Sequence, residues 1–97
     1  MSLDQEINNK IREALNSNKL DFKFAEFLST ILDNDDSSKL DESIAYHVKA
    51  KEGLTHSGLN NIAGKIYTAR TTYRELLDLV NNPDFYYFQS PQKISTS

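Results

Sequence analysis

Cysteine is absent from the 97-residue chain, and glycine and proline are scarce, with three and two copies. Without cysteine there is no disulfide, no thiolate metal ligand and no cysteine nucleophile. The three glycines (Gly53, Gly58 and Gly64) are too scattered for a glycine-rich phosphate-binding loop. The chain also lacks the run of roughly 20 apolar residues that a transmembrane helix needs, and its start lacks the pattern of a signal peptide. We therefore expect a cytoplasmic protein that does not enter membranes.

Charge of one sign dominates only the first half of the chain. Acidic residues outnumber basic residues by 14 to 11, which gives a net charge of −3. Residues 1–45 contain ten acids and five bases, whereas residues 46–97 contain four acids and six bases. Domains whose affinity depends on phosphate contacts usually carry clustered positive charge. The composition therefore argues against a general nucleic-acid binder, and only the second half suits an anionic partner.

Two amphipathic helices are predicted near the N-terminus. In residues 3–16, apolar side chains recur at steps of four, as they do along one side of a helix. These side chains are Leu3, Ile7, Ile11 and Leu15. Ser2 followed by Gln5 fits a capping box at the start of this helix. Residues 22–32 follow Asp21, a good N-cap, and carry the clearest helical stripe in the chain. That stripe consists of Phe24, Phe27, Leu28, Ile31 and Leu32.

A third helix is predicted over residues 39–52. Leu40, Ile44 and Val48 lie at steps of four and would line one face. Gly53 is well placed to end this helix, because glycine readily adopts the left-handed conformation found there.

A fourth and longest helix is predicted over residues 59–81. Apolar residues keep the helical period for six turns, and Asn81-Asn82-Pro83 ends the pattern. Gly64 and three threonines weaken the helical propensity, so a bend near Gly64, or two helices in place of one, is an open alternative.

No segment shows an alternating pattern typical of a strand, and there is no internal repeat. Amphipathic helices joined by short polar loops bury their apolar faces by packing as a bundle. The sequence therefore predicts an all-α fold, a small bundle of four helices (3–16, 22–32, 39–52 and 59–81), with residues 1–88 as a single helical domain. The polar residues 89–97 are expected to form a disordered tail.

Signatures of catalysis and of metal binding are missing. His47 and His56 are nine residues apart, which is not the helical spacing of a two-histidine metal site. The acidic loop that begins at Asp33 partly follows the calcium-binding loop of an EF-hand. It has Ser38 in place of the turn glycine and Ile44 in place of the bidentate glutamate. We expect no catalytic residue, no metal and no cofactor.

Residues 62–77 resemble a helix-turn-helix DNA reader. Ala63 lies where that family has a small residue for close helix crossing, and Tyr67 replaces its turn glycine. The resemblance implies an alternative function as a DNA-binding regulator. The residues that would contact DNA are Lys65, Arg70, Thr71, Thr72 and Arg74.

Residues 21–62 are locally similar to the small four-helix immunity proteins that neutralise nuclease bacteriocins. The similarity lies in Ala25-Glu26-Phe27-Leu28, the Asp/Ser loop that follows and Ser57-Gly58. Leu59-Asn60-Asn61-Ile62 stands where that family has an acidic segment with a tyrosine pair, so we assign no family.

Four consecutive aromatic residues, Phe85, Tyr86, Tyr87 and Phe88, are the most unusual feature of the sequence. They cannot all face one core, so they either seal the core as a flap or dock a partner. We expect a non-enzymatic protein-binding module, such as an inhibitor, an immunity-type protein or a regulatory adaptor. These four residues and the adjacent helix surface would bind a protein partner or a second copy of the chain.

Overall fold

Strands occupy much of the second half of the chain, where the sequence pattern predicted helices. The computed structural model describes residues 2–90, and within them it has three helices and a four-stranded antiparallel sheet. The elements are α1 (Gln5–Asn16), α2 (Phe22–Asn34), β1 (Ser43–Ala50), β2 (Leu59–Ala63), β3 (Ile66–Thr72), α3 (Tyr73–Val80) and β4 (Phe85–Gln89). The predicted all-α bundle is therefore wrong, and the fold is mixed α and β.

The first two helices lie where the apolar stripes predicted them. α1 begins after Asp4, whose side chain accepts a hydrogen bond from the Ile7 N–H, so Asp4 and not Ser2 is the N-cap. Asp21 caps α2 in the same way through the Phe24 N–H, as predicted. α2 ends at Asp35, which adopts the left-handed conformation with φ of 50°.

The predicted helix over residues 39–52 is wrong, because residues 43–50 form β1. Tyr46, Val48 and Ala50 are buried, while the residues between them are exposed. This period of two is that of a strand with one covered face.

The predicted helix over residues 59–81 is also wrong, except for its last part. Residues 59–72 form the hairpin of β2 and β3, and Gly64 lies in the turn with φ of 53°. Thr72 then begins α3 with a capping box, in which its hydroxyl accepts from the Glu75 N–H and the Glu75 carboxylate accepts from the Thr72 N–H. α3 ends at Val80, so the predicted stop at Asn81-Asn82-Pro83 is confirmed.

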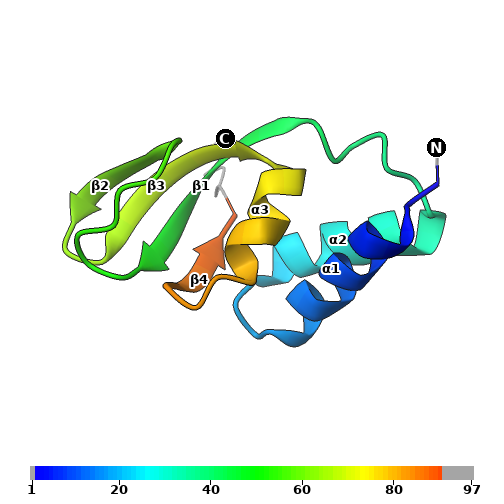
Figure 1. Ribbon diagram of the computed structural model, residues 1–97, viewed down its shortest axis with the longest axis horizontal. Coiled ribbons are helices and arrows are strands. Elements are labelled where there is room, and N and C mark those ends of the chain that lie inside the picture. The colour runs from blue at the N-terminus through cyan, green and yellow to red at the C-terminus, as the bar shows by residue number, and fades with distance from the viewer. Residues whose placement is uncertain (1, 91–97) are drawn as a thin grey trace, which may run out of the picture.

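The sheet has the strand order β2-β3-β1-β4, and each neighbouring pair is antiparallel. α3 carries the chain from β3 across β1 to β4, so β3 and β4 run parallel with β1 between them. All three helices lie on one side of the sheet, and the β2–β3 hairpin extends away from α1 and α2 (Figure 1). The core lies between these two layers and includes Ile11, Leu28, Val48, Tyr67 and Phe88.

A short parallel contact ties the end of the sheet to the helical layer. Leu20 bridges Phe88, the Phe88 N–H donates to the Lys19 carbonyl (2.6 Å), and the Asp21 N–H donates to the Phe88 carbonyl (3.1 Å). The Asp21 carboxylate also accepts hydrogen bonds from the N–H and the hydroxyl of Ser90. Residues 89 and 90 therefore belong to the fold, and the rest of the predicted tail lies outside the described residues.

None of the helices in residues 2–90 combines the length and the apolar character that spanning a bilayer requires.

Lys19 closes the C-terminal end of α3, and its removal should weaken the fold. Its Nζ donates to the carbonyls of Val80 (3.0 Å) and Asn82 (3.1 Å), where the helix dipole favours a cation. We expect Lys19→Met to lower the free energy of unfolding by about 1 kcal/mol, measured by urea denaturation. Lys23→Met, at an exposed position of α2, is the matched control. An equal effect of both substitutions would contradict this role.

Candidate functional site

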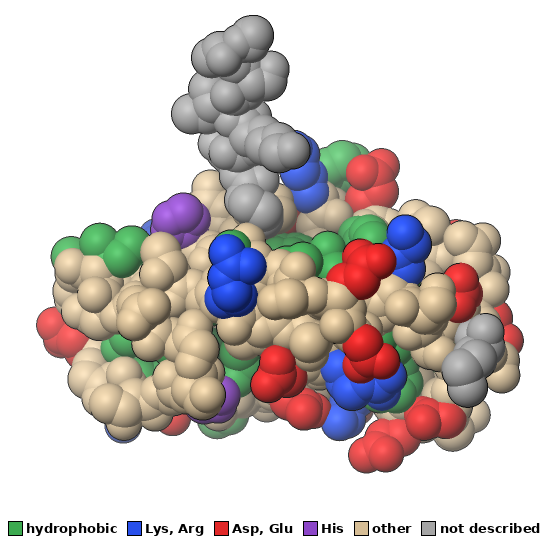
Figure 2. Space-filling model, turned by 90° about the horizontal axis from the view of Figure 1, so that it is seen from above, with side chains coloured by type: hydrophobic (Ala, Val, Ile, Leu, Met, Phe, Trp, Pro, Cys, Tyr) green, Lys and Arg blue, Asp and Glu red, His purple; other side chains and the backbone are tan. Residues whose placement is uncertain are grey.

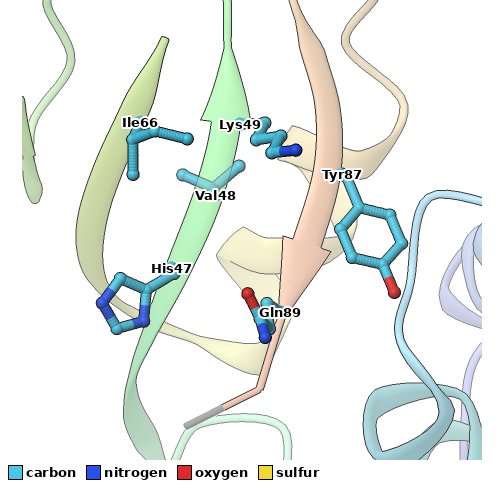
Figure 3. Close-up of a pocket in the computed structure, with 6 residues that line it drawn as sticks. All are labelled: His47, Val48, Lys49, Ile66, Tyr87 and Gln89. Carbon is cyan, nitrogen blue, oxygen red and sulfur yellow. The ribbon is translucent and has the colours of Figure 1, made fainter. Parts of the chain in front are cut away.

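One face of the sheet is left uncovered by the described residues. Along β1 and β3, the side chains that alternate with the buried ones point away from the helices. Figure 3 looks onto this side, with α3 behind the sheet. We call this surface the open face and define it by six residues of β1, β3 and β4. They are His47, Lys49, Ile66, Arg70, Tyr87 and Gln89.

The strand register arranges the open face in rows. His47 lies opposite Thr68 on β3 and Gln89 on β4, and Lys49 lies opposite Ile66 and Tyr87. Directly opposed side chains in a sheet have Cβ atoms about 4.5–5.5 Å apart, so the members of each row can act together. The rows border a shallow hollow of about 90 Å³, and Figure 3 shows the Lys49 side chain extending from β1 towards β4.

The open face has positive charge and no negative charge. None of the residues of the four strands is Asp or Glu, whereas Lys49 and Arg70 are both exposed on this face. Neither cation has an ion-pair partner within residues 2–90. The carboxylates lie in helices and loops, and most of those visible in Figure 2 lie over the helical end of the molecule. The difference in charge between the two halves of the sequence therefore becomes a difference between two layers of the fold.

The aromatic run in β4 is divided between the core and the surface. Phe85 and Phe88 are buried with their rings stacked, whereas Tyr86 and Tyr87 are 47% and 38% exposed. A bulge makes this division possible, because Tyr87 pairs with Lys49 while Phe85 pairs with the next residue, Ala50. Tyr86 is the extra residue of the bulge, and in a regular strand two phenylalanines three positions apart would point to opposite faces. Of the four predicted partner-binding residues, only the two tyrosines are available at the surface.

The residues expected to contact DNA do not form one surface. Residues 62–77 cover the end of β2, the turn, β3 and most of α3, so the helix-turn-helix reading is wrong. The buried Thr71 hydroxyl forms a hydrogen bond with the Tyr46 hydroxyl, with the two oxygens 2.8 Å apart, and Thr72 is the N-cap of α3. Arg74 pairs with Asp41, with Nε and Oδ1 3.1 Å apart, while Lys65 and Arg70 are exposed.

The histidines and the acidic loop do not create a metal site in the described part of the chain. His47 lies on the open face, whereas the His56 ring packs edge-on against Phe85. In the loop, Asp35 accepts a hydrogen bond from the Leu3 N–H, and Asp36 accepts from Ser38. Residues 2–90 contain no cluster of three metal-ligating side chains.

Sequence reasoning missed most of the open face, since His47, Lys49, Ile66 and Gln89 were not among the predicted site residues. The signal that could have found the two β1 residues is the alternation of Ile44, Tyr46, Val48 and Ala50. That alternation places residues 45, 47 and 49 together on the opposite face.

Comparisons of the chain with models of protein families, with curated proteins and with solved structures give no match.

Proposed function

We propose that this protein is a non-enzymatic, cytoplasmic protein-binding module that docks an acidic surface of a partner protein on its open face. The observation that carries the proposal is the face of the sheet that residues 2–90 leave uncovered, where Lys49 and Arg70 have no ion-pair partner among those residues and the strands contain no carboxylate. Complementary charge steers such an encounter and penalises wrong partners.

The composition of the open face supports a protein as the partner. Tyrosine and arginine are enriched at protein interfaces, and Ile66 and Tyr87 add apolar area at the centre of this face. A nucleic acid requires several cations along each stretch of backbone. The open face offers only Lys49 and Arg70, with His47 between them, on a protein of net charge −3.

Charge reversal on the open face should strongly reduce partner capture. We expect Lys49→Glu with Arg70→Glu to reduce capture of the partner at least about tenfold, because like charges would then meet. The measurement is affinity purification from cell extract with mass spectrometry, with and without nuclease. Lys23→Glu with Lys39→Glu changes the net charge equally at exposed sites outside the open face, and this control should leave capture unchanged.

The captured protein should carry an acidic surface and should cross-link to a photoreactive residue placed at position 87 but not at position 30 on α2. Equal loss of capture in the two charge-reversed variants would overturn the open face as the docking site. Loss of capture after nuclease treatment would show that a nucleic acid is the partner and would overturn the proposal.

A further inference from the structure

One edge of the sheet is paired with another segment of the chain, and the opposite edge is free within residues 2–90. The outer edge of β4 is occupied by residues 19–21 through the Leu20–Phe88 bridge. At the other end of the sheet, β2 pairs only with β3, and no other segment of residues 2–90 pairs with its outer side. An unpaired edge presents rows of N–H and C=O groups to another strand.

The register shows which groups of β2 are directed outwards. The Arg70 N–H donates to the Gly58 carbonyl (3.0 Å), and Leu59 lies opposite Ala69. In an antiparallel pair the hydrogen-bonded positions alternate, so Asn60 bonds to β3. Asn61 therefore directs its backbone N–H and C=O away from β3, at the centre of the free edge.

The side chains of β2 do not block this edge with charge. Proteins commonly protect exposed edges with lysine, proline or a bulge. β2 reads Leu59-Asn60-Asn61-Ile62-Ala63 and contains neither lysine nor proline. Its one irregularity is a shift of register between Asn61 and Ala63, which leaves Leu59, Asn60 and Asn61 in regular register with β3. Ile62 is 57% exposed and gives the edge an apolar side chain. The nearest cation along the chain is Lys65, which lies beyond the turn glycine.

From these observations we infer that β2 pairs antiparallel with β2 of a second copy of this chain, in a two-fold dimer centred near Asn61. β2 contains no charged residue, so no like charges of the two strands would meet across the axis. Each Lys65 lies in the turn beyond the end of β2, so the two would be at opposite ends of the paired strands, where salt screens their repulsion.

The distribution of charge also favours a second copy as the occupant. β2 lies at the end of the molecule away from α1 and α2, and most carboxylates visible in Figure 2 lie over the helical end (Figures 1 and 2). Pairing at β2 keeps the acidic layers of the two copies apart. The pairing would also join the two sheets into one continuous sheet with both open faces on the same side. The dimer does not depend on the proposed binding of a partner protein.

Sedimentation velocity of the purified chain tests the dimer directly. We expect a monomer–dimer equilibrium whose dissociation constant rises at least about tenfold in Ile62→Lys, because like charges would then lie close together across the two-fold axis. Phe22→Lys is the matched control, since Phe22 is an apolar side chain that is 77% exposed at the start of α2. This control should leave the equilibrium unchanged.

The absence of cysteine allows a second measurement with single-cysteine variants. Ile62→Cys should be joined into a covalent dimer by a short bis-maleimide, and Thr30→Cys on α2 should not. A chain that stays monomeric at the highest soluble concentration would overturn the inference. A dimer that Ile62→Lys does not weaken, or that cross-links equally through position 30, would overturn it as well.

Discussion

Phe88→Ala should lower the free energy of unfolding by about 3–5 kcal/mol, which is the usual cost of removing a fully buried aromatic ring. Phe88 is 0% exposed, and its ring lies 5.9 Å from that of Phe85 and 6.0 Å from that of Tyr46. The substitution would leave a cavity between the sheet and the helices. Urea denaturation monitored by circular dichroism measures the effect.

Tyr87→Ala is the control, because Tyr87 is the neighbouring aromatic residue on the open face. We expect it to cost less than about 1 kcal/mol, as is usual for an exposed side chain. If Phe88→Ala cost no more than Tyr87→Ala, the assignment of the two phenylalanines to the core and of the tyrosines to the surface would be refuted.

Stability should fall steeply above pH 10, and Tyr46 should account for much of the loss. Burial raises the pKa of Tyr46 from its usual 10.0 to about 12, although its hydrogen bond with Thr71 acts in the opposite direction. Below pH 10 the Tyr46 hydroxyl is protonated in both the folded and the unfolded state, so its ionisation does not lower the free energy of unfolding. Between pH 10 and about 12 the hydroxyl ionises only in the unfolded state, and this lowers the free energy of unfolding by about 2–3 kcal/mol in total.

Tyr46→Phe isolates this contribution. The variant should be slightly less stable at pH 7, because the hydroxyl of Tyr46 bonds to Thr71, but its stability should decline less between pH 9 and 12. Burial also raises the pKa of Tyr73, so part of the alkaline loss will remain in the variant. Parallel pH profiles of the two proteins would contradict the role of Tyr46.

The helices near the N-terminus were predictable because their signals are local. In α1 and α2 the apolar residues repeat at helical spacing and an aspartate precedes each helix as N-cap. The stop after α3 was equally local, since Asn81-Asn82-Pro83 does not continue a helix.

The strands were not recognised because their spacing fits two periods. Leu40, Ile44 and Val48 are four apart, which fits a helix, but every even position from 44 to 50 is apolar, which fits a strand. β1 is also buried between β3 and β4, which come later in the chain, so its conformation depends on distant partners.

In residues 59–72 strand signals coexist with apolar residues at helical spacing. β-branched residues at 68, 71 and 72 and a glycine at 64 favour a hairpin, and Tyr67, Ala69 and Thr71 alternate as buried positions. The open face could not be predicted without the sheet, because it collects residues from three strands that are far apart in the sequence.

The Leu20–Phe88 bridge has a consequence for how the protein is made. Phe88 joins the segment between the first two helices to β1, and it leaves the ribosome after every other element of the described fold. Until then β1 lacks its neighbour on the β4 side and residues 19–21 lack their partner, and contacts so far apart in sequence form slowly. Nascent chains stalled before position 85 should therefore be degraded readily by proteases, and resistance should arise only once β4 has emerged.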